Sequence, residues 1–224
     1  MTRRIAAAQA TIREALHHCP DLVISISGGK DSVAAALIAR SVSPTMPLVI
    51  AHPPNPLPYR AAHVADLKAF FGGPWIDVDY GWDVDKVIDG RAVYPARLKI
   101  KTLTGLRRSG FVLGLRVAES RARQINHRQK GAVYQTATGW RCLPIARWSA
   151  EEVLGLASYF GAPIAEPYRL PSFGFPLDEI RDGTWWAHRT DMAMDDWMRH
   201  NYPSCHRFWL RSTEIALAER RADF

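Results

Sequence analysis

The sequence has few cysteines and no long hydrophobic run. Its three cysteines, Cys19, Cys142 and Cys205, are an odd number, and no two of them lie close together along the chain. This excludes a disulfide framework, and it excludes an iron–sulfur cluster held by four thiolates. The longest apolar run, residues 33–39, is far shorter than the roughly 20 residues that span a bilayer. We therefore expect a cytoplasmic protein without a membrane helix.

Acidic charge is also scarce relative to basic charge. The chain has 23 arginines and 6 lysines against 22 acidic residues, which gives a formal net charge of +7. A positive excess favours an anionic partner, such as a nucleotide, a nucleic acid or a sulfated metabolite. Arginine-rich codon usage would produce the same composition, so both interpretations stay open. With 224 residues, 47% of them hydrophobic, the chain is long enough to bury a sizeable core.

Apolar segments alternate with helical segments from the N-terminus onward. An amphipathic helix with Ile5, Ile12 and Leu16 on one face precedes a predicted buried strand at residues 21–27. An alanine-rich segment then predicts a helix at residues 31–40, and a second apolar run predicts a strand at 48–52. A strand, a glycine turn, a helix and a strand in this order predict a right-handed crossover in a parallel sheet.

The alternation continues to about residue 163. We predict further helices near residues 59–71 and 117–127 and from 149 onward, and strands near 75–80, 111–115 and 132–136. Ser149 and Glu152 have the spacing of a capping box. Residues 164–224 differ, because prolines interrupt them and tryptophans are frequent, and we predict a helix at 207–221. The sequence is therefore divided into an α/β domain, 1–163, and an accessory region, 164–224, packed on it.

A glycine pair stands between the first predicted strand and its helix. The segment reads Ser27-Gly28-Gly29-Lys30-Asp31-Ser32. Glycines let the backbone turn tightly and bring its N–H groups close to an anion, and the start of a helix adds further N–H groups. The hydroxyls of Ser25, Ser27 and Ser32 are additional donors. The segment therefore predicts a phosphate-binding loop, with a spacing different from that of a Walker A loop.

This loop resembles the S-G-G-x-D-S motif of the PP-loop, or N-type ATP pyrophosphatase, superfamily at all five fixed positions. The resemblance implies a mostly parallel, doubly wound α/β sheet of the adenine nucleotide alpha-hydrolase-like, Rossmann-like type, with a helical, Trp-rich C-terminal region. It also implies that the loop holds the β- and γ-phosphates of ATP while the α-phosphorus is attacked. Asp31 would help to position Mg²⁺, or would be a plain acid at a helix start. Lys30 would be a phosphate counter-charge or a solvated side chain.

A second segment, residues 114–123, resembles the G-x-R-x-x-E-S-x-x-R signature of phosphoadenylyl-sulfate (PAPS) reductases and of their relatives in DNA phosphorothioation. The resemblance implies phosphate or nucleotide contacts for Gly114, Arg116, Glu119, Ser120 and Arg123. Arg121 and Arg123 cannot share a helix face, so at least one of them is expected to be structural, and Glu119 is expected to pair with an arginine. A solvated charged helix is the alternative interpretation.

Two further segments bear on the site. Leu143-Pro144-Ile145 with Trp148 resembles the L-P-I-x-x-W segment of the same family, and we expect Trp148 to pack in the core. A proline-rich segment follows the strand at residues 48–52. Because ligands of open α/β sheets bind at the carboxyl ends of strands, residues 52–60, including His52, are expected to border the base or the ribose. Rigid connection alone would also explain the prolines.

These patterns predict a PAPS reductase-like PP-loop enzyme that binds ATP and Mg²⁺ and adenylates an unknown acceptor, with release of pyrophosphate. Its expected catalytic residues are Asp31, Lys30 and Arg116. The first alternative is a thioredoxin-dependent PAPS reductase that uses Cys205, although Ser204 and His206 replace the glutamate and glycine of the family's E-C-G-x-H setting. The second is a non-catalytic module that binds nucleotide or nucleic acid. Homo-oligomer formation stays open.

Overall fold

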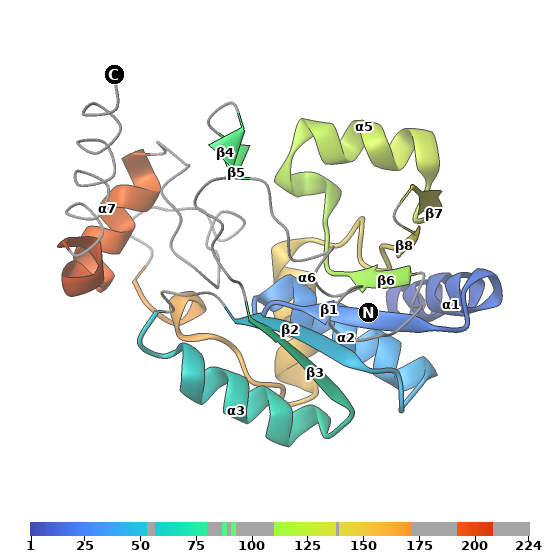
Figure 1. Ribbon diagram of the computed structural model, residues 1–224, viewed down its shortest axis with the longest axis horizontal. Helices are drawn as coiled ribbons and strands as arrows, with labels where there is room; N and C mark the ends of the chain where they lie inside the picture. The colour runs from blue at the N-terminus through green and yellow to red at the C-terminus, as the bar shows by residue number, and fades with distance from the viewer. Residues whose placement is uncertain are drawn as a thin grey trace.

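A computed structural model (Figure 1) describes residues 1–52, 57–79, 87–88, 91–92, 110–137, 139–171 and 192–207. Its centre is a six-stranded sheet in the order β3-β2-β1-β6-β8-β7. These strands are β1 (Leu22–Ile26), β2 (Leu48–His52), β3 (Trp75–Asp79), β6 (Gly110–Leu113), β7 (Val133–Thr136) and β8 (Gly139–Cys142). Neighbours are parallel except β7 and β8, which pair antiparallel. This mostly parallel α/β sheet confirms the predicted fold class.

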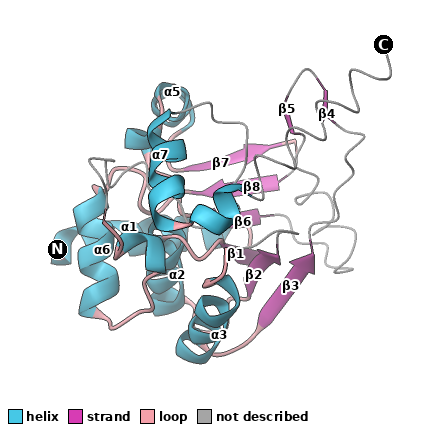
Figure 2. Ribbon diagram, turned by 90° about the vertical axis from the view of Figure 1, so that its left-hand side faces the viewer, coloured by secondary structure: helices cyan, strands magenta, loops and turns pink. Residues whose placement is uncertain are grey.

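Helices cover one face of the sheet, as Figure 2 shows. They are α1 (Thr2–His18), α2 (Lys30–Val42), α3 (Arg60–Phe71) and α6 (Ala150–Tyr159). Helix α5 (Arg121–Lys130) lies apart, beyond β6 and β7 (Figure 1). The remaining elements are β4 (Val87–Ile88), β5 (Arg91–Ala92), the 3-10 turns η2 (Val117–Glu119) and η3 (Glu166–Tyr168), and α7 (Met192–Asn201). Among the described residues, no helix is long and apolar enough to cross a membrane.

Strand β1 is apolar on both of its faces because it lies in the middle of the sheet. Leu22, Ile24 and Ile26 belong to the core cluster on the helix side, whereas Val23 belongs to the cluster on the other face. A central strand of a parallel sheet is covered on both sides and therefore needs an uninterrupted apolar run. The short β-branched segment thus indicated the position of the strand as well as its conformation.

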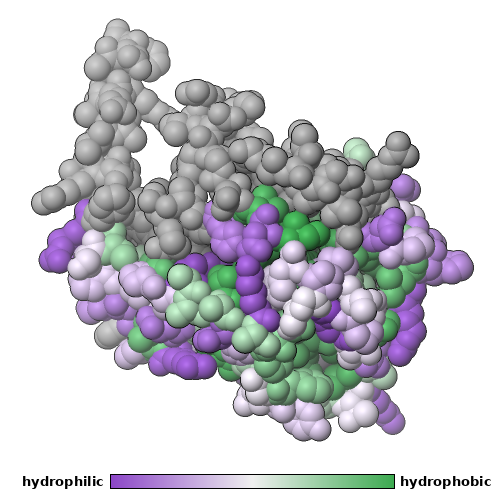
Figure 3. Space-filling model, turned by 60° about the horizontal axis from the view of Figure 1, so that its bottom comes forward, coloured by the Kyte–Doolittle hydropathy of each residue, from purple (hydrophilic) through white to green (hydrophobic). Residues whose placement is uncertain are grey.

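Helix α2 is buried along most of its length. Ala34, Ala35, Ala36 and Ala39 have no exposed surface, and both α1 and α6 pack against the helix. Alanine side chains let neighbouring helices approach closely, and a helix that is apolar on most sides belongs in the interior. On the face drawn in Figure 3, by contrast, the coloured residues are a mosaic of hydrophilic and hydrophobic types. The start of α2 is therefore held firmly behind the end of β1.

Some predicted elements differ from those of the structure. The predicted helix at 117–127 is the turn η2 followed by α5, because Ser120 is extended and its hydroxyl caps α5. Strand β8 and helix α7 were not predicted. The capping box of Ser149 and Glu152 is confirmed, and Trp148 is buried as predicted. The prolines at 53–56, most of the basic stretch 91–108 and most of the predicted helix 207–221 lie outside the described residues.

Gly114 brings the end of β6 against the start of α2. A Cβ atom on Gly114 would lie 2.4 Å from the carbonyl oxygen of Asp31 and 2.6 Å from the backbone nitrogen of Ser32. Backbone atoms of a buried helix cannot rotate away as a flexible side chain can, so this position has no room for a side chain. Close contact of β6 with α2 therefore explains the glycine that opens the second motif.

We expect Gly114→Ala to lower the free energy of unfolding by about 1–3 kcal/mol, because the added methyl group overpacks this contact. Chemical denaturation measures the change. Gly155→Ala is the matched control, since Gly155 lies in α6 and its nearest neighbour would be the flexible Cε of Met1 at 3.7 Å. That substitution should stabilise the protein by up to about 1 kcal/mol through helix propensity. Equal stability of the two variants would contradict the close contact.

Candidate functional site

The strand order places the two predicted motifs side by side. Strand β1 has β2 on one side and β6 on the other, so the connections that follow β1 and β6 diverge at this point of the sheet. Open α/β sheets bind ligands at the carboxyl ends of strands where the strand order reverses in this way. Residues 27–29 follow β1 and residues 114–116 follow β6, so both motifs lie at this switch point.

The glycine loop is held from within by Ser32. Gly28 has a φ of 96°, in the left-handed region that favours glycine. The Ser32 hydroxyl accepts the N–H groups of Ser27 and Gly28, both at 3.1 Å, and donates to the Gly29 carbonyl at 2.8 Å. The Gly29 N–H donates to the Ser27 hydroxyl at 3.3 Å. Ser25 lies earlier in β1, on the sheet face opposite α2, and its predicted contact with phosphate stays a prediction.

Helix α3 holds the same loop from outside. Arg60 donates from Nη1 to the carbonyl of Ser27, and Nε2 of His63 lies 2.9 Å from the carbonyl of Gly28. A carbonyl only accepts, so this histidine nitrogen carries a proton. Both side chains are buried. Two carbonyls of the loop thus accept hydrogen bonds from α3. These bonds do not use the N–H groups of the loop.

Sequence reasoning missed this role of α3. Arg60 was the last residue of the range expected to border the base or ribose, and His63 was not singled out. Their spacing of three positions puts both on one face of the helix, which is the signal that would have paired them. Their target, the carbonyls of a loop that precedes α3 by some thirty residues, follows only from the tertiary contact between the start of α3 and that loop.

A buried ion pair joins the two motifs. Nε of Arg116 lies 2.5 Å from Oδ1 of Asp31, and Nζ of Lys30 lies 3.2 Å from Oδ2. Arg116 is fully buried, and Lys30 is 3% exposed. Burying a guanidinium is costly unless a carboxylate faces it, so Asp31 is what allows Arg116 to lie at the switch point. Of the three residues predicted to be catalytic, Lys30 and Arg116 therefore both contact the third, Asp31.

The same contacts test the predicted Mg²⁺ ligand. Both carboxylate oxygens of Asp31 face a cation, which does not fit a carboxylate that binds Mg²⁺ directly. Among the residues that the structure describes, no group of three histidine, cysteine, aspartate or glutamate side chains is arranged to hold a metal. Asp31 orients Lys30 and Arg116, and its predicted role in positioning Mg²⁺ stays a prediction.

The rest of the second motif supports Arg116. Oε2 of Glu119 accepts the backbone N–H of Arg116 at 3.2 Å and forms an ion pair with Arg123, so the expected pairing of Glu119 with an arginine is observed. The Ser120 hydroxyl accepts the N–H of Arg123 at 3.2 Å and caps α5. These contacts hold the backbone around Arg116. Nucleotide contacts of Glu119, Ser120 and Arg123 stay predictions.

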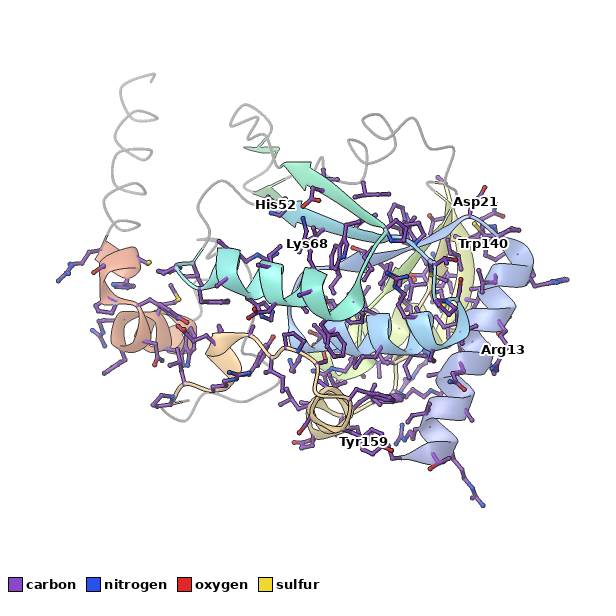
Figure 4. All side chains as sticks on the ribbon, turned by 90° about the horizontal axis from the view of Figure 1, so that it is seen from below. Arg13, Asp21, His52, Lys68, Trp140 and Tyr159 are labelled. Atoms are coloured by element: carbon purple, nitrogen blue, oxygen red, sulfur yellow. The ribbon has the colours of Figure 1, made fainter. Side chains whose placement is uncertain are left out.

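His52 ends β2 but is engaged by an ion cluster at the edge of the sheet. Its Nε2 lies 2.6 Å from Oδ1 of Asp77, and Nζ of Lys68 lies 2.6 Å from the same oxygen; Figure 4 shows His52 and Lys68 close together. Burial raises the pKa of Asp77, but the hydrogen bonds and charges of Lys68 and His52 outweigh burial and hold it below its usual value. The predicted contact of His52 with nucleotide stays a prediction.

Tyr168, in η3, contacts the phosphate loop from the region predicted to be accessory. Its hydroxyl accepts the backbone N–H of Lys30 at 3.3 Å, and Nζ of Lys30 lies 5.1 Å from the centre of its ring. A single tyrosine in a proline-interrupted segment carries no pattern that would have identified it. Its role is decided by the tertiary contact alone.

An aromatic cluster lies behind Tyr168. This α7 cluster consists of Leu57, Trp197, Met198 and Tyr202, with Tyr59, Tyr168, Leu170 and Cys205 packed against it. Cys205, the predicted redox thiol, is thus partly buried against the same cluster as Tyr168, and its redox role stays a prediction. Cys142 differs, because burial and the nearby charge of Glu14 raise the pKa of its thiol far above the usual value, and its Sγ donates to the carbonyl of Thr11.

Comparisons with known proteins bear on the fold. The sequence matches no protein-family model and no curated protein. FMN adenylyltransferase from Candida glabrata, solved with FAD and inorganic pyrophosphate, is similar with a TM-score of 0.59 at 16% identity, over 75% of this chain and 59% of that chain. PAPS reductase from Candida auris, solved as a phosphate complex, is similar with a TM-score of 0.58 at 13% identity, over 79% of this chain and 88% of that chain.

Yeast FAD synthetase in complex with FAD gives a TM-score of 0.56 at 14% identity, over 77% of this chain and 62% of that chain. The chain matches less than two thirds of the length of the FMN adenylyltransferases and of this FAD synthetase. At such low identities the likeness concerns the fold alone. The chain therefore has a mostly parallel α/β fold of the adenine nucleotide alpha-hydrolase-like type.

Proposed function

We propose that the chain binds ATP at residues 27–32 and transfers its adenylyl group to an acceptor, with release of pyrophosphate. The observation that carries this proposal is the meeting of the glycine loop with the buried Arg116 at the switch point of the sheet. The first turn of α2 directs backbone N–H groups toward the same place, and the positive end of the helix favours an anion there. Together they form a cradle suited to a polyphosphate.

The charges around the loop suit a leaving pyrophosphate. Lys30, Arg60 and Arg116 contact the loop or its first helical turn, and Asp31 pairs with Lys30 and Arg116 there. Negative charge grows on the pyrophosphate as the bond to the α-phosphorus breaks, and fixed N–H groups and cations stabilise that charge. Mg²⁺ enters this proposal as part of the substrate, bound to the phosphates of ATP. The acceptor is unassigned.

The similar structures support adenylyl transfer as the type of reaction. FMN adenylyltransferase of Candida glabrata has been solved in complex with ATP, and also with FAD and inorganic pyrophosphate. Those ligands are the substrate and products of an adenylyl transfer, and they belong to that protein. Together with the complete S-G-G-x-D-S motif at residues 27–32, they support ATP as the ligand in this proposal. An enzyme of this type is therefore our first proposal.

Calorimetry against ATP with Mg²⁺, AMP, PAPS and adenosine 3′,5′-bisphosphate tests the ligand. We expect ATP to bind most tightly, and Asp31→Asn to weaken its binding roughly 10- to 100-fold, because Lys30 and Arg116 lose a charge-assisted partner that orients them. Asp77→Asn is the matched control, since it neutralises an aspartate of the ion cluster at the edge of the sheet. ATP binding that is equal in the two variants would contradict the proposed site.

A sulfonucleotide reductase is the second candidate, favoured by the place of Cys205 against the α7 cluster that also contacts Tyr168. In this reaction the Cys205 thiolate attacks the sulfur of PAPS, a sulfur–sulfur bond forms, and adenosine 3′,5′-bisphosphate leaves. The dithiol of thioredoxin then reduces the thiosulfonate, which releases sulfite and restores the thiol. The oxidised product is the disulfide of thioredoxin.

If this second candidate is correct, Cys205→Ser abolishes sulfite formation from PAPS while the affinity for PAPS is unchanged. Ser204→Ala is the control, because Ser204 is the exposed neighbour of Cys205 and carries no thiol. A coupled thioredoxin assay measures turnover, and calorimetry measures binding. Turnover retained in Cys205→Ser, or its absence in the wild-type protein, removes the reductase.

We also propose nucleic acid as a partner of α5. This helix has no buried residue and no acid, and it exposes Arg121, Arg128 and Lys130. Burial, followed by the nearby charge of Arg147, lowers the pKa of His127 on the same helix. No acidic side chain among the described residues pairs with these three exposed cations. A polyanion would neutralise the surface and release counterions.

Replacing Arg121, Arg128 and Lys130 with glutamine should weaken binding to single-stranded RNA and to DNA. The slope of log K against log salt is negative, and its magnitude should decrease by roughly 0.7–0.9 for each cation that contacts a phosphate. Fluorescence anisotropy over a range of salt concentrations measures both quantities, and ATP binding is the internal control because α5 lies outside the loop. An unchanged salt slope would show that α5 does not contact the phosphate backbone.

A further inference from the structure

Four successive N–H groups of the phosphate loop donate to hydroxyl groups. Those of Ser27 and Gly28 donate to Ser32, that of Gly29 to Ser27, and that of Lys30 to Tyr168. The acceptors of the first three N–H groups belong to the loop itself, whereas Tyr168 is 138 positions from Lys30 in the sequence. The Lys30 N–H is therefore the one of these four whose partner comes from another part of the fold.

Tyr168 is also joined to α7. It is the last residue of η3, and the first residue of η3, Glu166, accepts a hydrogen bond from the Tyr202 hydroxyl at 2.8 Å. Tyr202 is a member of the α7 cluster, against which the ring of Tyr168 packs. The ring of Trp197 in α7 lies 5.7 Å from that of Tyr202. A displacement of Tyr168 would thus disturb contacts that hold α7.

We propose that Tyr168 is a specificity-determining residue of the loop, whose hydroxyl holds the Lys30 N–H until a phosphate of a polyphosphate replaces it. This inference rests on the proposed binding of phosphate by residues 27–32. The replacement also moves Tyr168 away from the loop, and the contacts of η3 transmit that movement to α7. The site then binds only anions that compete with the Tyr168 hydroxyl for this N–H group. Binding of such an anion alters the contacts of α7.

The exchange is favourable only for a charged acceptor. The Lys30 N–H reaches the phenol oxygen at 3.3 Å, which is long for an N–H···O hydrogen bond. A phosphate oxygen forms a shorter, charge-assisted bond roughly twice as strong, whereas a neutral acceptor gains nothing by replacing the phenol. The Lys30 ammonium, 5.1 Å from the centre of the Tyr168 ring, is attracted to the same phosphate. Tyr168 therefore favours ligands that form a stronger hydrogen bond with the Lys30 N–H than its own hydroxyl does, as pyrophosphate would.

Pyrophosphate titrations of three proteins test the proposal: the wild type, Tyr168→Phe and Tyr159→Phe. We expect Tyr168→Phe to bind pyrophosphate roughly 2- to 10-fold more tightly, because the competing hydrogen bond is gone while the ring remains in the α7 cluster. Tyr159→Phe is the matched control, since Tyr159 is 81% exposed at the end of α6, and its affinity should equal that of the wild type. Equal or weaker binding by Tyr168→Phe would overturn the proposal.

Hydrogen exchange at the end of α7 and in the residues that follow it supplies the second readout. The N–H groups of Tyr202 and His206 donate to the carbonyls of Met198 and Tyr202. Pyrophosphate should speed exchange at residues 198–206 of the wild type, and it should leave exchange unchanged in Tyr168→Phe, where the phosphate has room without moving the ring. In Tyr202→Phe, exchange in this segment should be fast before pyrophosphate is added, because the bond to Glu166 is lost.

These outcomes separate this inference from the proposed function. If the wild type binds pyrophosphate, but Tyr168→Phe binds it no more tightly and α7 exchange does not respond, the role of Tyr168 is wrong and phosphate binding stands. If neither the wild type nor the variant binds pyrophosphate or ATP, both proposals fall. Tighter binding by Tyr168→Phe together with loss of the exchange response would establish the role of Tyr168.

Discussion

A buried ion pair joins the segment that follows β6 to the first turn of α2, at the carboxyl ends of the central strands. Arg116 follows β6, Asp31 lies in the first turn of α2, and their side chains meet at 2.5 Å with the guanidinium fully buried. Separating them would leave a buried charge without its carboxylate, which costs several kcal/mol in typical proteins, on the order of 3–5. Gly114 gives the two chain segments room to approach, and Glu119 holds the backbone of Arg116. The phosphate loop therefore has a defined shape wherever this fold forms.

The carbonyl groups and the N–H groups of the loop have different kinds of hydrogen-bond partner. Arg60 and His63 engage the carbonyls of Ser27 and Gly28, whereas hydroxyl groups engage the N–H groups. Polar backbone groups in a buried turn must be satisfied, and here the carbonyls and the N–H groups are satisfied by different kinds of partner. In the proposed function, an anion would compete with these hydroxyls, which are weak acceptors, and would leave the carbonyl contacts in place. Binding of phosphate would thus be an exchange of partners.

The C-terminal part of the chain bears on the loop through aromatic contacts. Tyr168 contacts Lys30, and the α7 cluster packs behind Tyr168 with Cys205 at its margin. Cys205 and Tyr168 thus pack against the same cluster, and Tyr168 is the member that contacts the loop through Lys30. The predicted boundary between residues 163 and 164 marks a change in amino-acid composition. Residues from both sides of it, Lys30 and Tyr168, nevertheless contact each other at the candidate site. The division into two regions stays a prediction.

The sequence by itself determined the features that depend on local pattern. The β-branched run of β1, the alanines of α2 and the glycine pair between them predicted a parallel sheet with a phosphate loop, because burial and backbone freedom constrain residue type at each position. Only the tertiary structure decided which distant side chains meet that loop. His63, Tyr168 and the pairing of Arg116 with Asp31 depend on strand order and on the packing of α3 and η3, and His52 turns to Asp77 instead. Contacts between segments far apart in the chain leave no periodic signal in the sequence.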